Sequence, residues 1–184
     1  MKSQHFDIHI LDAPLGAEII DYKLRQDLDE NEADRLQSAL ADHYLLVFRR
    51  QRTSPRLRQV VGRRLVAHSL APEGEAALFI NLQLAYDTLP VGLRRVVHSV
   101  RAEQDGAAGP LPLVRLHPES GRRSLLVADP ATTRLVGASP AESDEILHEL
   151  HAHAVRPQHL YRHHWQPQDL LFWDPHSVTP VRAM

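Results

Sequence analysis

The sequence predicts a mixed domain of strands and helices, either an α+β fold or a β-barrel decorated by helices. Two observations favour this class. Short apolar runs are bounded by turn-forming residues, as strands are. Between them lie segments that begin with helix N-cap residues and repeat apolar residues at helical spacing. The chain has 184 residues, enough for one domain with a real core and too few for two of ordinary size, so we expect a single domain over residues 1–184.

The predicted strands are short and are separated by turns. FDIHIL and AEII flank the turn at Pro14–Gly16, where proline and glycine favour a reversal of the chain. YLLVF, residues 44–48, reads as a buried strand. The later predicted strands are LVRL at 113–116, SLLVA at 124–128 and DLLFWD at 169–174.

Three predicted helices have clear starts. Asp29 is an N-cap whose capping-box partner is Glu32, and Ser54-Pro55 and Ser139-Pro140 open the other two. The apolar positions expected to face the core are Ala33, Leu36 and Leu40 in the first helix, Leu57, Val60, Val61 and Leu65 in the second, and Ile146, Leu147, Leu150 and Ala154 in the third. NLQLAYDTLP and VGLRRVVHSV read as further helical segments, and AEQDGAAGPLP is the most linker-like stretch.

The composition is that of an ordinary globular protein. With 43% hydrophobic residues, 24% charged residues and a formal net charge of −2, it gives no bulk attraction to nucleic acid or membranes. The absence of cysteine excludes disulfides, thiolate metal sites and a cysteine nucleophile. The N-terminus lacks the apolar core of a signal peptide, and no apolar run approaches the roughly 18 residues of a membrane helix. We therefore expect a cytoplasmic protein.

Thirteen histidines raise the question of a metal site, because neutral imidazole is the commonest protein ligand for metals. HELHAH resembles the zinc motif HExxH, but Ala152 stands where the second histidine belongs. His148 and His151 share a helix edge, and two ligands without a third favour a solvated face. The pair His163–His164 points to opposite sides of a strand, one to the core and one to the surface. We predict no metal site here.

A basic cluster contains seven arginines within sixteen residues: Arg49, Arg50, Arg52, Arg56, Arg58, Arg63 and Arg64. An arginine face could follow phosphates, but no aromatic residues are interleaved with it and the chain as a whole is slightly acidic. We therefore expect a solvated or carboxylate-paired face and no nucleic-acid binding. A non-enzymatic module that binds an acidic partner through Arg49–Arg64 stays an alternative.

Four blocks of the chain resemble, in order, the taurine dioxygenase (TauD/TfdA) family of Fe(II)- and 2-oxoglutarate-dependent oxygenases. The blocks are PLGAEIIDYKLRQDLDENEADRLQSALADHYLLVFRRQ, PEGEAALFINLQLAYDTLP, VRLHPESGRRSLLV and PAESDEILHELHAHAVRPQHLYRHHWQPQDLLFWD. The resemblance implies a double-stranded β-helix, the jelly roll of clavaminate synthase-like proteins, with helices packed outside. It also implies Fe(II) held by two histidines and a carboxylate, and an arginine that pairs with 2-oxoglutarate.

The family's functional residues do not carry over. The His-x-Asp segment is expected between about residues 66 and 72, but His68 is followed by Ser69 and Leu70. Ala77 stands at the family's threonine near the cosubstrate, and Pro180 or Val181 at its distal histidine. The cosubstrate arginine would lie beyond Met184. Further departures are Gln168 at a turn glycine, and Pro175 and His176 in place of Asn-Arg.

The leading interpretation is therefore a shortened, non-catalytic relative with an incomplete barrel, for which we predict no catalytic, cofactor-binding or metal-binding residues. Missing strands would leave exposed sheet edges, so we expect self-association or a completing chain.

The enzyme alternative is an active oxidoreductase, a 2-oxoglutarate dioxygenase, that uses substitute ligands or a completing partner chain, and the only local candidates for substitutes are His68, His117, Asp174 and His176. Asp174 and His176 are two residues apart and would share a face on a strand. The opposing interpretation is that Asp174 ends a strand in a turn with Pro175 and that His176 lies in solvent.

Overall fold

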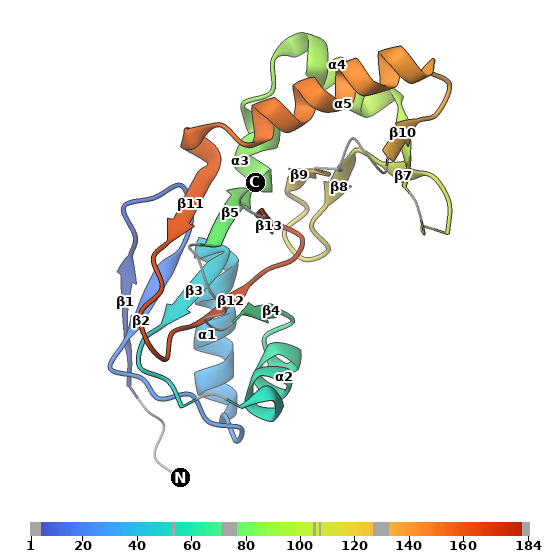
Figure 1. Cartoon of the computed structure of the whole chain (residues 1–184). Helices are drawn as coiled ribbons and strands as arrows, with labels where there is room; N and C mark the ends of the chain where they lie inside the picture. The colour runs from blue at the N-terminus through green and yellow to red at the C-terminus, as the bar shows by residue number, and fades with distance from the viewer. Residues whose placement is uncertain are drawn as a thin grey trace. The chain divides into compact units, whose positions relative to one another are not determined.

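The computed structural model describes residues 5–52, 54–70, 77–104, 106, 108–126 and 133–181. The chain divides into two compact units (Figure 1). Unit 1 is formed by Met1–Phe79 with Tyr161–Met184, and unit 2 by Ile80–Leu160. Because compact units can belong to one domain, the single domain over 1–184 stays a prediction.

Unit 1 is built on a five-stranded sheet with the order β1-β2-β3-β12-β4. Its strands are β1 (Asp7–Ile10), β2 (Ala17–Ile20), β3 (Leu45–Phe48), β12 (Leu170–Trp173) and β4 (His68–Leu70). β1 and β2 form the predicted hairpin, in which Gly16 adopts a φ of +105° that favours glycine. β12 pairs antiparallel with both β3 and β4. Within the described residues this sheet stays open, as the predicted incomplete barrel requires.

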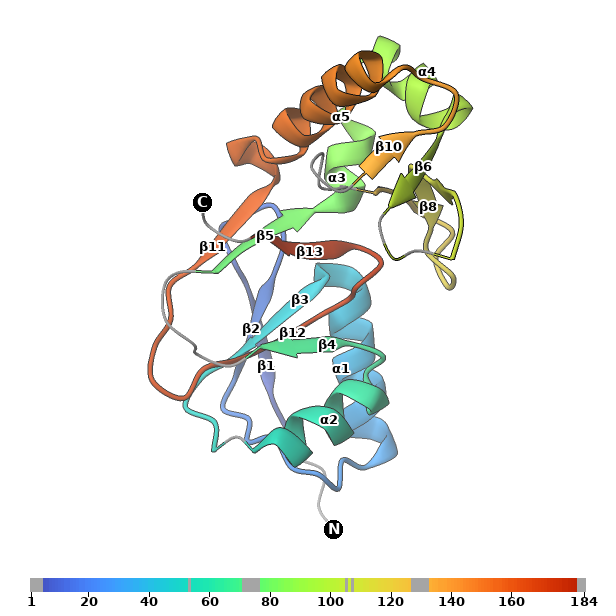
Figure 2. The ribbon, with the colours of Figure 1, turned by 45° about the vertical axis from the view of Figure 1, so that its right-hand side comes forward.

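One face of this sheet is covered by the helices α1 (Glu30–His43) and α2 (Pro55–Arg64), as Figure 2 shows. Strand residues of even number in β3 and β12 point toward these helices, because side chains alternate along a strand. The buried cluster on this face includes Leu46, Phe48, Leu170 and Phe172 from the sheet, Leu36, Ala39 and Leu40 from α1, and Leu57, Val61 and Leu65 around α2. It is the main hydrophobic core of unit 1.

The opposite face of the sheet carries a second cluster. Leu45 and Val47 of β3 and Leu171 and Trp173 of β12 point to this side, together with Phe79. The Phe79 and Trp173 rings lie 5.4 Å apart in an edge-to-face contact. A three-stranded sheet has the order β11-β5-β13, with β11 (Leu160–His163), β5 (Ala77–Asn81) and β13 (Val178–Val181).

Unit 2 combines short helices and short strands. Its helices are α3 (Leu82–Asp87), α4 (Val91–Ser99), α5 (Pro140–Ala154) and the 3-10 helix η1 (Pro157–His159). Its strands are β6 (Arg101–Gln104), β7 (Leu111–Pro112), β8 (Val114–Leu116), β9 (Arg123–Leu125) and β10 (Thr133–Leu135). β6 lies between β10 and β7, and β8 pairs with β9.

The three predicted helix starts are confirmed. Asp29 and Ser139 each form a capping box, and Ser54 caps α2 with proline at the first turn. Glu32 has a second role, because its buried carboxylate also accepts hydrogen bonds from Arg25 at 2.8 and 2.9 Å.

Two predictions about the elements were wrong. Val60 is 37% exposed, since the buried stripe of α2 follows Leu57, Val61 and Leu65 and Val60 lies to one side of it. AEQDGAAGPLP contains most of β6 and all of β7 rather than a plain linker, because β6 is paired on both sides. The end of the predicted strand SLLVA lies outside the described residues.

Candidate functional site

Three of the four candidate iron ligands lie in unit 1. His68 begins β4 and pairs in register with Trp173 of β12. The imidazole packs edge-on against the Trp173 indole with ring centroids 5.8 Å apart, and His68 is otherwise exposed. The expected His-x-Asp segment continues from here to about residue 72, and residues 71 and 72 lie outside the described residues.

Asp174 and His176 do not form the strand pair that a shared ligand face requires. β12 ends at Trp173, and residues 175–177 form a turn before β13. Oδ1 of Asp174 accepts the backbone N–H of His176 at 2.8 Å, and Oδ2 accepts the hydroxyl of Ser177. The carboxylate therefore stabilises its own turn, and the predicted turn at Asp174-Pro175 is confirmed. His176 is half-buried, so the prediction that it lies in solvent was wrong.

The positions aligned with the other family residues hold side chains without ligand atoms. Pro180 and Val181 are the last residues of β13, where Pro180 is exposed and Val181 half-buried. Ala77 opens β5 and is half-buried. A pyrrolidine ring, an isopropyl group and a methyl group offer nothing to a metal ion or a carboxylate.

The fourth candidate, His117, belongs to unit 2 and holds the turn between β8 and β9. Its Nδ1 accepts the backbone N–H groups of Glu119 and Ser120, each at 3.2 Å. The His117 carbonyl accepts the Gly121 N–H at 2.9 Å, and the His117 N–H donates to the Arg122 carbonyl at 2.8 Å. These contacts give His117 a structural role in a hairpin turn.

The histidines of α5 differ in exposure. His148 is exposed and its Nδ1 lies 2.7 Å from the carbonyl of Asp144, as the predicted solvated face requires, whereas His151 is half-buried. No group of three or more histidine, aspartate or glutamate side chains suited to a metal ion gathers anywhere in the part of the chain that the structure describes.

A buried histidine pair in unit 2 was missed from the sequence. His153 and His159 are 1% and 0% exposed, with ring centroids 5.0 Å apart. His159 Nδ1 lies 3.0 Å from the carbonyl of His153, and its Nε2 lies 2.8 Å from Oγ1 of Thr88. Burial lowers the pKa of His159, so its imidazole is neutral at neutral pH. The pair links α5, η1 and the end of α3. The signal available in the sequence was that His153 continues the Leu147, Leu150 and Ala154 side of the helix.

A buried polar chain in unit 1 joins β11, β12 and β3. The Tyr161 hydroxyl lies 2.8 Å from His163 Nδ1, and His163 Nε2 lies 3.1 Å from Oδ2 of Asp169. Arg49 donates to the same Asp169 oxygen and lies 3.4 Å from Glu18. The prediction that the pair His163–His164 splits between core and surface is confirmed, because His163 is buried and its neighbour is exposed.

This polar chain has the properties of a structural network. Burial raises the pKa of Tyr161 to about 12, so its hydroxyl is not an activated nucleophile. The pKa of His163 is lowered by burial and by the Arg49 guanidinium. Since Arg49 is committed to Asp169 and Glu18, it does not belong to an open arginine face, and the predicted basic face is reduced to residues of α2 and its flanks.

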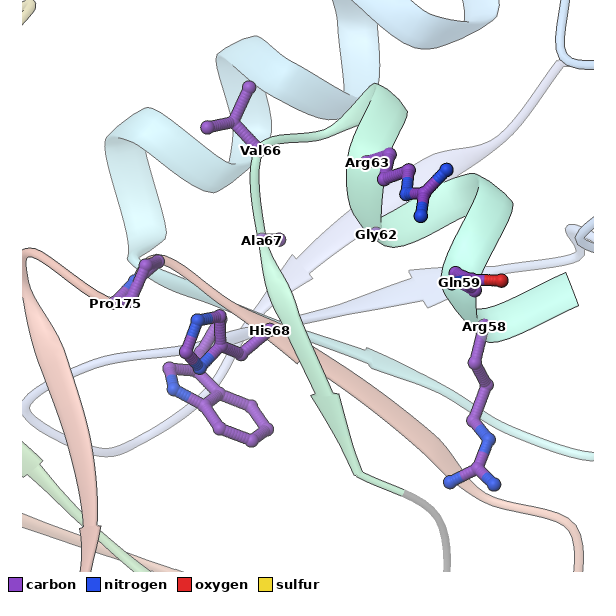
Figure 3. A pocket seen from close by; sticks show the side chains of 9 residues that line it. Arg58, Gln59, Gly62, Arg63, Val66, Ala67, His68 and Pro175 are labelled. Atoms are coloured by element: carbon purple, nitrogen blue, oxygen red, sulfur yellow. The ribbon is translucent and has the colours of Figure 1, made fainter. Parts of the chain in front are cut away.

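An open pocket of about 570 Å³ lies between α2, the start of β4 and the turn after β12 (Figure 3). Arg58, Gln59, Gly62 and Arg63 line it from α2, and Val66, Ala67 and His68 from the segment leading into β4. Trp173 and Pro175 complete the lining. The floor depends on Gly62, because a Cβ there would lie 2.9 Å from the Ala67 carbonyl oxygen. No acidic side chain lines the pocket among the described residues.

The sequence of this chain matches the family described as "Taurine catabolism dioxygenase TauD, TfdA family" over residues 64–179. The chain belongs to the TauD/TfdA family. Three of the four blocks that carried the resemblance lie within or overlap this range, and the family assignment made from them is confirmed.

Several relatives in this family are similar to part of the chain. Pentalenolactone F synthase of Streptomyces arenae is 34% identical over 131 residues, which take in 55% of this chain and 44% of the relative. An alpha-ketoglutarate-dependent 2,4-dichlorophenoxyacetate dioxygenase of Burkholderia sp. is 33% identical over 134 residues, 62% of this chain and 45% of the relative. The chain thus matches slightly less than half the length of these TauD/TfdA proteins.

Solved structures of the TauD/TfdA type share the fold. A taurine dioxygenase from Burkholderia xenovorans superimposes with a TM-score of 0.81 at 24% identity, covering 96% of this chain and 82% of that one. AAD-2, crystallised with Mn(II) and N-oxalylglycine, superimposes with a TM-score of 0.81 at 20% identity. The match covers 97% of this chain and 92% of the AAD-2 chain. The predicted jelly-roll type of fold is therefore confirmed. Within the described ranges, no helix has both the length and the apolar character needed to cross a membrane.

Proposed function

We propose that this chain is a non-catalytic member of the TauD/TfdA family, whose own residues do not hold the family's Fe(II) and 2-oxoglutarate. The observation that carries the proposal is the Asp174 turn, in which both carboxylate oxygens already accept hydrogen bonds from His176 and Ser177. The turn fixes the orientation of this carboxylate, and Asp174 does not share a strand face with His176 as a pair of ligands on one strand would.

The remaining candidates do not supply the other two ligands. His68 packs on Trp173, and the Nδ1 of His117 holds a hairpin turn. Pro180 or Val181 stands where the resemblance expects the distal histidine, and neither has a ligand atom. The residues that the structure describes thus do not fit the iron site that the family implies.

The alignments support an internal deletion. The match to the Streptomyces arenae synthase is 131 aligned positions long, but it uses only 55% of the 184 residues of this chain. Because 55% of 184 residues is fewer than 131, some positions of the relative inside the match have no counterpart here. The match to the Burkholderia sp. dioxygenase has the same property. A deletion is the simplest reason for the absence of a His-x-Asp pair after His68.

The experiment is anaerobic addition of Fe(II) and 2-oxoglutarate to the purified chain, followed by visible absorption spectroscopy. We expect no metal-to-ligand charge-transfer band, and a catalytic TauD/TfdA enzyme treated in parallel provides the positive control. A band that forms with this chain and is lost in Asp174→Asn would overturn the proposal in favour of an oxidoreductase using substitute ligands. A band that appears only after a second chain is added would favour a completing partner.

We also infer that unit 1 associates with a second copy through the edge strand β1. Its Ile8 and Ile10 are 43% and 63% exposed, and β1 pairs only with β2 among the described strands. In an antiparallel pair centred on Ile8, Asp7 would face His9 of the second copy twice, so each carboxylate would lie opposite an imidazole.

A further inference from the structure

The pocket beside α2 gathers basic side chains without an acidic counterpart. Arg58 is half-buried and Arg63 is exposed, and His68 lies across the pocket from them. None of the ion pairs found among the described residues involves either arginine. Arg49, by contrast, is neutralised by Asp169 and Glu18. The pocket is therefore a place where two guanidinium groups are available to a ligand.

The rest of the lining is apolar, and one of its residues is held in a costly conformation. Val66 is 66% exposed and has a φ of +51°, a left-handed conformation that a β-branched residue rarely adopts. It stands where a helix C-cap usually has glycine: Ala67 N–H donates to the Gly62 carbonyl at 2.8 Å and Val66 N–H to that of Arg63 at 3.3 Å. Such strain tends to occur at ligand sites. An exposed valine at this position offers an apolar contact to a ligand.

We propose that this pocket binds a small organic oxyanion, either a carboxylate or a phosphate monoester, that carries a short apolar group. The fork of donors on a guanidinium matches the oxygens of both anions, and Arg58 and Arg63 both line the pocket from one helix. The apolar contacts available to this group in the lining are Val66, Trp173 and Pro175. This site does not depend on whether the chain holds iron.

A nucleic-acid backbone fits these observations less well. A polyphosphate chain is bound by cations spread along an extended surface. Here Arg58 and Arg63 line this concave site, and Arg49 at the start of the basic cluster is already paired. A phosphodiester backbone would also make no use of the apolar residues that line the pocket. A discrete small anion uses the arginines and the apolar wall together.

Isothermal titration with three butyl probes tests the proposal. Butyrate and monobutyl phosphate carry the same apolar group on the two kinds of oxyanion, and butan-1-ol is the neutral control. We expect at least one of the two anions to bind with a dissociation constant of about 1 mM or below, and butan-1-ol to bind about tenfold more weakly or not at all. The anion that binds more tightly shows whether the site prefers a carboxylate or a phosphate monoester. Failure of both anions to bind, or equal binding of the alcohol, would overturn the proposal.

Arginine variants locate the binding. Arg58→Ala and Arg63→Ala should each weaken the bound anion about tenfold, because each removes one charged fork. Arg56→Ala is the matched control, since it removes the same charge from the same helix at a residue that does not line the pocket. Equal losses in all three variants would mean that only the general charge of the helix matters. That result would contradict a site.

Val66→Gly separates binding from folding. Glycine relieves the left-handed strain, so the variant should melt at a higher temperature than the parent chain. It also removes the apolar contact, so we expect weaker binding of the butyl anion and unchanged binding of inorganic phosphate or acetate. If the variant is more stable but binds the butyl anion as tightly as the parent chain does, Val66 does not contact the ligand. That result would contradict the apolar part of the proposed site.

Discussion

Gln168 lies in a turn where the family has glycine, and it adopts a backbone conformation that is unfavourable for glutamine. Its φ of +66° is one that glycine adopts at low cost. The turn is still made, because the Gln168 carbonyl accepts Gln51 N–H at 2.7 Å and Asp169 N–H donates to Gln166 at 3.1 Å. The sequence alone identified Gln168 as a departure from the family's turn glycine. It could not show that the backbone kept the glycine conformation after the glycine was lost.

Gln168→Gly should therefore stabilise unit 1. Removing a non-glycine side chain from the left-handed region should gain about 1 kcal/mol after the entropic cost of glycine, which corresponds to a rise of about 2–4 °C in the melting temperature. Thermal unfolding followed by tryptophan fluorescence is a suitable measurement, because both tryptophans lie in unit 1. Gln166→Gly is the control, since Gln166 has no positive φ and the change should cost stability. A loss of stability in Gln168→Gly would contradict the expected strain.

Among the elements, those with a strong local signal were predicted and those that depend on pairing were not. The capping boxes at Asp29 and Ser139 fix α1 and α5 through short-range hydrogen bonds, which a sequence displays directly. β10 has the sequence TRL and β6 has RAEQ, neither of which is apolar enough to indicate a strand. They are strands because each finds the other as a partner. Pairing between segments that are distant in the sequence cannot be predicted from the sequence of either segment alone.

The polar chain on β11 makes the stability of unit 1 depend on pH. His163 is buried, and its pKa in the folded chain lies below its ordinary value of 6.5 because of burial and the nearby Arg49. Between those two values the unfolded chain binds more protons than the folded one. Stability should be complete above about pH 6.5 and should fall as the pH drops below it, by at most about 1.4 kcal/mol per pH unit for this one group.

Urea unfolding at several pH values between 8 and 5 measures this dependence, with tryptophan fluorescence as the signal. Trp165 is a direct reporter, because its ring lies 4.5 Å from that of His163. His163→Gln should flatten the fall in stability on the acid side. His164→Gln changes the exposed neighbour and should leave it unchanged. If both variants follow the parent chain, the titration of His163 does not control stability.

At the scale of the whole molecule, the family and fold were predictable and the candidate pocket was not. Blocks of sequence carried the resemblance to the TauD/TfdA family, and they aligned Pro180 or Val181 with the family's distal histidine. The pocket unites Arg58 with Trp173, residues that come together only because β12 inserts between β3 and β4. That order places a C-terminal strand beside α2. No local pattern in either segment indicates it.

The same sheet order leaves β1 at an edge, and this leads to a prediction for the assembly. An exposed strand edge with Ile8 and Ile10 on one face is a template for another strand. Sedimentation velocity over a range of concentrations should show a dimer that dissociates on dilution. Ile8→Lys should shift the equilibrium toward monomer, because a lysine at the centre of a symmetric pair faces another lysine and blocks edge pairing.

Val91→Lys is the matched control for this experiment. Val91 is 69% exposed in α4 of unit 2, so the change removes a similar apolar surface and adds the same charge away from the edge. We expect it to leave the dimer intact. If both variants dissociate the dimer equally, the effect is one of net charge and not of β1. A parent chain that sediments as a monomer at every concentration would exclude self-pairing and leave the edge to a different chain.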